Sequence, residues 1–193
     1  MPKIGMEPLR RDALIRATIT EVGRSGAKGA TVSRIASRAG VSPALAHHYF
    51  GTKDRIFLAA MRHILVEFAD GVRTRMATAK GPKQRLAAIV DASFDDDQLH
   101  PDTVAAWLAF YVEAQRSPEA ARLLRVYARR LNSNMVHELR QLAPEATARR
   151  VAQGLASLID GFYIRLALQD RMPAHSEIKA LVTDYIALNL GRI

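Results

Sequence analysis

The 193-residue sequence contains no cysteine, a single tryptophan and only 6% aromatic residues. Without cysteine it can form no disulfide, no zinc–thiolate site and no cysteine nucleophile. No apolar run approaches the ~20 residues that cross a membrane, and none follows the basic N-terminus, so we expect neither a membrane partner nor a signal peptide. An apolar fraction of 49% is sufficient for a hydrophobic core. We therefore expect a cytoplasmic globular protein.

Strand patterns are also scarce, since alternating apolar and polar residues are hard to find and Asn-Gly pairs are absent. Prolines instead open segments that have helical periodicity. We predict an all-α fold. Its nine expected helices span residues 8–25, 32–39, 43–49, 53–79, 83–96, 102–116, 118–142, 145–169 and 174–190.

Residues suited to helix ends support these bounds. Gly26 and Gly29 are expected to end the first helix, and the run Asp95–Asp97 is expected to end the fifth. Four hydroxyl residues precede predicted helices and are candidate N-caps: Thr31, Ser42, Thr52 and Ser117.

Positive charge is concentrated near the N-terminus. The whole chain has a formal net charge of +9. Residues 1–55 contain ten Lys or Arg and four Asp or Glu, a net +6, which leaves +3 for the other residues. This segment favours a polyanionic partner such as nucleic acid. A merely soluble basic surface would have the same charge.

Residues 31–53, TVSRIASRAGVSPALAHHYFGTK, have the pattern of two short helices joined by a turn. Gly40 is suited to the turn, and Ser42 with Pro43 opens the second helix. Such a pair forms a helix-turn-helix. Small residues at the start of the second helix would let its backbone approach base edges in the major groove. Ala46 and Phe50 are expected to be core residues.

The string GVSPALAHHYFGTKDRIF resembles the DNA-binding signature of the TetR family of bacterial repressors. The length and the helix layout also fit that family from end to end. Leu45, Ala46 and His47 depart from its usual residues, which are often polar, Leu and Tyr at these positions. The matching residues are Gly40, Val41, Ser42, His48, Tyr49, Phe50 and Lys53.

The resemblance implies which residues contact double-stranded DNA. It assigns base contacts to Ser33, Pro43, Ala44, Leu45 and His47, and phosphate contacts to Thr31, His48, Tyr49 and Lys53. Leu45 could pack on a thymine methyl group, and His47 could donate to a purine edge, more effectively when protonated. Adjacent His47 and His48 project about 100° apart on a helix, so we expect no metal site. No cofactor is expected either.

The second half contains an aromatic cluster with two possible roles. Trp107, Phe110 and Tyr111 share one helix face. They could be ordinary core residues of a helical bundle. Aromatic faces near a carboxylate could instead form a cage for a quaternary ammonium ion. The other candidate ligand-binding residues are Asp91, Phe94, Asp95, Asp160 and Tyr163. Asp160 could equally pair with Arg165 or lie at the dimer seam.

A second resemblance covers most of residues 86–168. The stretches LAAIVDASFDDDQ, AAWLAFYVEAQRSP, RRLNSNMVHELRQL and LASLIDGFYIRLAL are similar to the choline-responsive repressors of glycine betaine synthesis within the TetR family. This similarity implies choline as the effector. A TetR-type regulator of drug efflux, with a broader cationic or lipophilic ligand, is the alternative. We expect no enzyme, because no nucleophile–base pair at recognisable spacing and no metal set occurs.

Two amphipathic segments, 145–169 and 174–190, close the chain. Their apolar stripes predict a homodimer through the last two helices, as a palindromic operator requires. The alternative is that the stripes merely close the core of the monomer. The expected domains are residues 1–52 for DNA binding and 53–193 for effector binding and dimerisation. The stripes are Ala152, Leu155, Ala156, Ile159 and Tyr163, and Ile178, Leu181, Val182, Tyr185 and Leu188.

Overall fold

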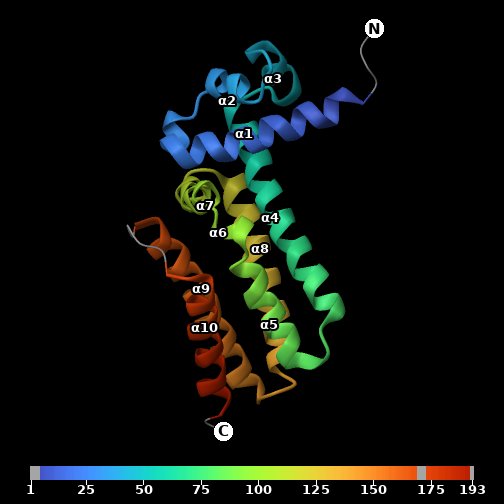
Figure 1. Ribbon diagram of the computed structural model, residues 1–193, viewed down its shortest axis with the longest axis vertical. Coiled ribbons are helices and arrows are strands. Elements are labelled where there is room, and N and C mark those ends of the chain that lie inside the picture. Colours follow the sequence, from blue (N-terminus) through green and yellow to red (C-terminus); the bar gives the residue numbers. More distant parts are fainter. Residues whose placement is uncertain (1–4, 169–172, 192–193) are drawn as a thin grey trace. The chain divides into compact units, whose positions relative to one another are not determined.

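The computed structural model describes residues 5–168 and 173–191, and within these ranges it contains helices and no strand (Figure 1). All nine expected helices are present, with ends shifted by a few residues. Residue 169, the last of one expected helix, lies outside the described ranges. The nine are α1 (Met6–Gly29), α2 (Val32–Arg38), α3 (Pro43–Phe50), α4 (Lys53–Thr78), α5 (Gly81–Ser93), α7 (Pro101–Glu113), α8 (Pro118–Leu139), α9 (Glu145–Leu168) and α10 (His175–Leu190).

The end of the fifth helix was predicted wrongly. The helix α5 ends at Ser93, and a one-turn helix, α6 (Asp96–Leu99), follows. The cause is the Asp95 carboxylate, which accepts a hydrogen bond from the Asp96 N–H at 2.9 Å and so begins a new helix. At the end of α1, Gly26 breaks the helix with φ 66, as its expected role requires, but helical backbone resumes as far as Gly29.

The four predicted N-caps are confirmed. Each hydroxyl oxygen accepts a hydrogen bond from the backbone N–H three residues later, which satisfies one donor of the first helical turn. The four pairs are Thr31 with Arg34 at 3.3 Å, Ser42 with Leu45 at 3.2 Å, Thr52 with Arg55 at 3.3 Å and Ser117 with Ala120 at 3.2 Å.

The helices form two compact units. The first contains the chain through Leu65 together with Pro101–Leu123. Here α7 packs against α1 so closely that Gly23 faces the backbone of Asp102. The ring of Phe57 in α4 meets that of Phe110 in α7 edge-on, with 4.9 Å between centroids. These contacts build one core around the helices that carry the helix-turn-helix.

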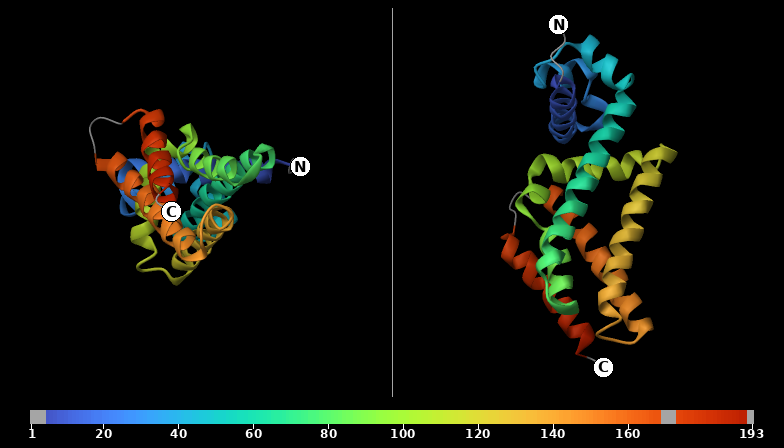
Figure 2. Two further views of the ribbon diagram at one scale, coloured as in Figure 1. Left: turned by 90° about the horizontal axis from the view of Figure 1, so that it is seen from below. Right: turned by 90° about the vertical axis from the view of Figure 1, so that its right-hand side faces the viewer.

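The second unit contains Val66–His100 and the chain from Leu124 onward. The helices α9 and α10 lie side by side, and α10 also contacts α5 (Figure 2). Phe94, Met135 and Leu155 are fully buried in this unit. The functional division expected between residues 52 and 53 stays a prediction.

By length and composition α9 is apolar enough to cross a membrane, the one such helix in the described ranges. The sequence does not show this as one uninterrupted apolar run, because Asp160 and Arg165 lie within it. A core helix of a soluble protein has the same composition. One face of α9, including Val151, Leu155 and Ile159, is buried in the second unit.

Candidate nucleic-acid interface and effector site

The turn between α2 and α3 has the geometry of a helix-turn-helix. Gly40 follows α2 with φ 67, the left-handed conformation that glycine adopts without steric cost. The Gly40 N–H donates to the Ser37 carbonyl at 3.2 Å, and the Val41 N–H donates to Ala36 at 3.0 Å. This pair of bonds is the Schellman motif, which ends α2 and directs the chain into α3.

The short helix α3 is anchored on one side and open on the other. Ala46 and Phe50 are buried, which confirms them as core residues. The Arg11 guanidinium donates to the Tyr49 carbonyl at 2.8 Å and lies over the Phe50 ring, 4.5 Å from its centroid. We did not predict this role for Arg11. Its only signal in the sequence was its place among the basic residues of the first helix.

The structure places the predicted DNA-contacting residues on the surface of α2, α3 and the start of α4. Lys53 Nζ donates to the Lys28 carbonyl at 3.3 Å, so its cation is held beside the end of α1. Leu45, Tyr49 and Lys53 are half-buried. The exposed members are Thr31, Ser33, Pro43, Ala44, His47 and His48.

A buried carboxylate lies beneath the outer face of α2. Glu21 is 3% exposed, and it forms ion pairs with Arg38 at 2.6 Å and Arg34 at 3.0 Å. The hydrogen bond from Arg38, helped by the charge of Arg34, lowers the pKa of Glu21 against the opposing effect of burial. These three residues, with Ser33 and Ser37, line an open cavity of about 550 Å³. Sequence reasoning missed this cluster, because its members are far apart in the chain.

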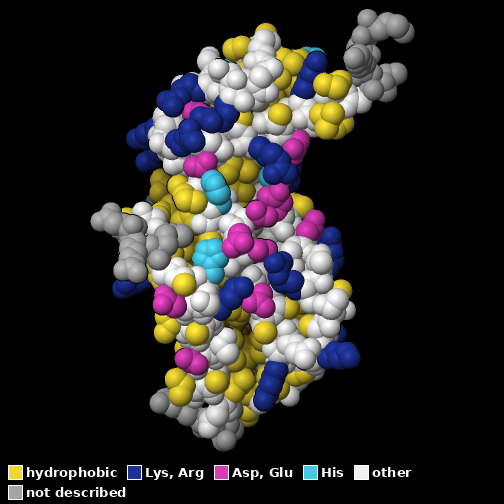
Figure 3. Space-filling view, in the orientation of Figure 1, with side chains coloured by type: hydrophobic (Ala, Val, Ile, Leu, Met, Phe, Trp, Pro, Cys, Tyr) yellow, Lys and Arg dark blue, Asp and Glu magenta, His cyan; other side chains and the backbone are white. Residues whose placement is uncertain are grey.

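Figure 3 shows Lys and Arg side chains gathered over the part of the first unit where α1 and α2 lie. The concentration of positive charge in the first 55 residues is therefore also a concentration in space. An exposed, mainly basic helix-turn-helix can bind the phosphates of a duplex and present side chains to its base edges.

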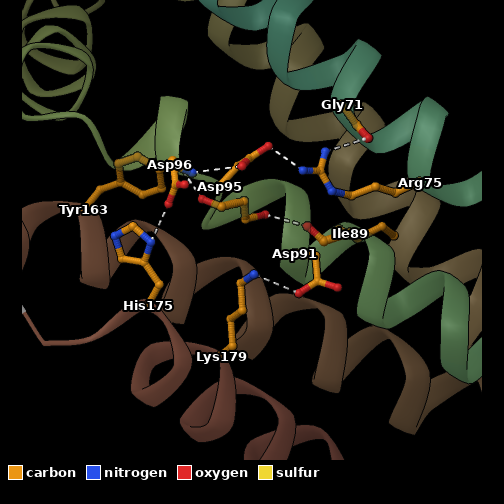
Figure 4. A network of polar contacts seen from close by, with 10 residues as sticks. Gly71, Arg75, Ile89, Asp91, Asp95, Asp96, Tyr163, His175 and Lys179 are labelled. Carbon is orange, nitrogen blue, oxygen red and sulfur yellow. Dashed lines mark hydrogen bonds and ion pairs between the residues drawn. The ribbon is translucent and has the colours of Figure 1, made fainter.

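Five of the eight predicted ligand-binding residues lie in the second unit. Two of their carboxylates already have cationic partners: Asp91 pairs with Lys179 at 3.1 Å, and Asp95 pairs with Arg75 (Figure 4). Asp160 is exposed on α9.

The two aromatic members of this group, Phe94 and Tyr163, contact each other. The Tyr163 ring stacks on Phe94 with 6.4 Å between centroids, and its hydroxyl donates to the Ser93 carbonyl at 2.7 Å. Burial raises the pKa of Tyr163 and of Tyr127, and the negative charge of Asp160 raises both further. The second unit therefore brings two tyrosines within electrostatic reach of one carboxylate. Tyr127 was missed because its helix gave no aromatic cluster in sequence.

The other three predicted residues, Trp107, Phe110 and Tyr111, lie in the first unit on α7. The rings of Trp107 and Tyr111 stack at 6.0 Å, whereas Trp107 and Phe110 meet edge-on at 6.5 Å. Trp107 and Phe110 are buried, as core residues of a bundle would be.

Comparison with known proteins identifies the family. Residues 82–191 match the model of the BetI-type transcriptional repressor C-terminal domain, and residues 14–60 match that of the tetR family of bacterial regulatory proteins. The chain belongs to the BetI-type repressors of the TetR family. It is 52% identical over 191 residues to the HTH-type transcriptional regulator BetI of Brucella suis, covering 99% of this chain and 96% of that protein. The BetI regulator of Agrobacterium fabrum is 50% identical over 190 residues, covering 98% of this chain and 92% of that protein.

Solved structures agree with this assignment. A putative transcriptional regulator from Pseudomonas aeruginosa matches this repressor with a TM-score of 0.81 and 28% identity, covering 95% of this chain and 92% of that one. A putative transcriptional regulator from Saccharomonospora viridis, solved in complex with choline, matches with a TM-score of 0.80 and covers 93% of this chain and 96% of that one. At 22% identity the second match supports the fold alone. The all-α TetR-like architecture expected from the sequence is confirmed.

Proposed function

We propose that this repressor binds a palindromic operator as a homodimer, controls genes for choline uptake and glycine betaine synthesis, and responds to choline. The proposal rests on about 50% identity to BetI regulators over nearly the whole chain. In it, residues 1–52 bind DNA, residues 53–193 bind the effector and dimerise, and the protein acts in the cytoplasm without enzymatic activity. The exposed helix-turn-helix carries DNA recognition.

DNA binding can be tested on the duplex upstream of the gene for this repressor. The full-length protein should retard that fragment at low salt, and a scrambled fragment of equal length should compete poorly. Absence of any shift at low salt would refute operator binding.

The chemistry of the second unit supports the proposed recognition of choline. A quaternary ammonium ion cannot donate a hydrogen bond, so it is held by aromatic faces and by a nearby negative charge. Tyr127, Tyr163 and Phe94 supply aromatic rings, and Asp160 supplies the charge. We assign the electrostatic role to Asp160 because its negative charge acts on both tyrosines, and we keep Trp107, Phe110 and Tyr111 as a second candidate cluster.

Calorimetry with choline tests this assignment. Asp160→Asn should weaken choline binding about tenfold or more, because it removes the negative charge near the tyrosines. Asp91→Asn is the matched control and should leave affinity nearly unchanged, since Lys179 already pairs with Asp91. Titrations with betaine aldehyde and a bulky cationic dye separate a choline sensor from a broad drug sensor. Wild-type protein that binds the dye but not choline would refute choline as the effector.

The dimer interface is proposed to lie on exposed residues of α9 and α10. The expected stripe on α9 is largely buried within the subunit, as Leu155, Ile159 and Tyr163 show. That stripe thus helps to close the monomer core. Large apolar side chains on the same two helices nevertheless remain exposed: Ile164 at 45%, Leu168 at 78%, Leu181 at 58% and Leu188 at 61%.

A further inference from the structure

The side chain of His47 is tied to the end of its own helix. His47 Nδ1 lies 2.8 Å from the carbonyl oxygen of Gly51, one turn later. In return, the Gly51 N–H donates to the His47 carbonyl at 2.7 Å. Gly51 has φ 77 and ψ −67, a conformation that favours glycine, and in it the Gly51 carbonyl is within reach of the ring.

This contact determines which ring nitrogen carries the hydrogen. A carbonyl oxygen can only accept, so Nδ1 must be the protonated nitrogen of the neutral ring. The other nitrogen, Nε2, then has a lone pair and no hydrogen. The neutral His47 side chain, exposed on α3, is therefore an acceptor at its free end, and not the donor to a purine edge that the sequence suggested.

We propose that His47 reads an exocyclic amino group in the major groove, either N6 of adenine or N4 of cytosine. These are the groove's amino donors, whereas guanine and thymine present the acceptors O6, N7 and O4, which repel a lone pair. The inference rests on the proposed operator binding and adds the chemistry of the base that this side chain recognises.

The neighbouring residues leave this polar recognition to His47. Pro43, Ala44 and Leu45 were assigned base contacts by resemblance, and their side chains contain no polar atom. Among the α3 residues assigned base contacts, only His47 can therefore distinguish bases by a side-chain hydrogen bond. The adjacent His48 points about 100° away around the helix and belongs to the residues assigned to phosphates.

Selection from a randomised palindromic duplex pool at pH 8, where an ordinary imidazole is neutral, locates the base. The full-length wild type, His47→Ala and His48→Ala are selected in parallel. His47→Ala should lose preference at one position of each half-site, and that position should be adenine or cytosine. His48→Ala, the matched control, should bind more weakly but keep the same preference. A preference for guanine or thymine at that position, or no change in His47→Ala, would overturn the proposal.

Base analogues then test the amino group in the wild type, without relying on the folding of any variant. Unsubstituted purine in place of adenine, or 2-pyrimidinone in place of cytosine, removes only the exocyclic amino group. At one position of the half-site this should weaken binding about two- to tenfold, the usual effect of one hydrogen bond. The two analogues also distinguish adenine from cytosine. Unchanged affinity at every substituted position would refute the inference while leaving operator binding intact.

Nuclear magnetic resonance of ¹⁵N-histidine-labelled protein reports the tautomer directly. At pH 8 the His47 signal, assigned by its loss in His47→Ala, should have a protonated Nδ1 and an unprotonated Nε2. The reverse tautomer would overturn the proposal. Failure of the wild type to select any sequence would instead count against the proposed function.

Discussion

Gly23→Ala tests the close approach of α1 and α7 on which the first unit depends. A Cβ atom at Gly23 would lie 2.7 Å from the Asp102 Cα and 2.8 Å from its carbonyl oxygen. Both are backbone atoms, so no rotamer change relieves the clash, and the helices must separate by more than half an ångström to regain ordinary contact. Forcing atoms into a packed core in this way costs about 1–3 kcal/mol.

The opposing effect is helix propensity, since replacing a mid-helix glycine by alanine stabilises a helix by about 0.5–1 kcal/mol. Gly161→Ala on α9 is the matched control, because its added Cβ meets nothing within 4 Å. Both variants gain the same propensity, so the difference between them isolates the steric cost. Gly23→Ala should therefore be less stable than Gly161→Ala by about 1–3 kcal/mol.

Urea denaturation measures this difference. Far-UV circular dichroism follows both variants, and the fluorescence of Trp107, buried in the same unit as Gly23, follows the first unit. A lower midpoint with an unchanged slope is expected for Gly23→Ala. Equal stability of the two variants would show that α1 and α7 are not in backbone contact at this point, and would refute the packing described for this unit.

Three further predictions concern DNA binding, stability at acidic pH and the dimer interface. Lys53→Gln should weaken all duplexes alike and reduce the slope of log K against log salt by about 1, measured by fluorescence anisotropy; a sequence-selective loss would contradict a phosphate contact. The hydrogen bond from Arg38 lowers the pKa of Glu21 in the folded protein. The ionised Glu21 carboxylate therefore stabilises the fold fully above its ordinary pKa of 4.5, and this stabilisation is lost as the pH falls through the lower pKa of the folded state. In Glu21→Gln the free energy of unfolding should therefore decrease less steeply at acidic pH than in the wild type. An unchanged pH dependence would disprove this role of Glu21. Leu181→Glu should be a folded monomer in sedimentation experiments, whereas the control Val126→Glu on α8 should remain a dimer. A dimer of Leu181→Glu would exclude the exposed face of α10 as the interface.

The fold was predictable from sequence because its signals are local. A hydroxyl residue before a helix, as at Ser42, needs only a nearby N–H to cap it, and that N–H is three residues away. Gly40 likewise serves a turn formed by its immediate neighbours. The helix α6, which was not predicted, also has a local cause. A run of three aspartates is equally suited to the start of a helix and to the loop that follows one, so the sequence did not distinguish the two.

The polar clusters were less predictable because they join distant segments. Nothing near Glu21 in sequence indicates that Arg34 and Arg38 will surround it, and nothing near Tyr127 indicates Asp160. The candidate carboxylates illustrate the same limit. Asp91 and Asp160 look alike in sequence, but only packing brings Lys179 of α10 to Asp91.

The two faces of α3 make stability and DNA choice separable in this repressor. The buried face, with Ala46 and Phe50, holds the helix in the first unit. Ala44 is exposed, so substitutions there should change base preference while altering the free energy of unfolding by no more than about 0.5 kcal/mol. His47 is the exception, because its ring also bonds the Gly51 carbonyl that ends the helix. Its replacement should therefore change both properties, and a His47 variant that alters base preference at wild-type stability would show that this bond adds nothing to the fold.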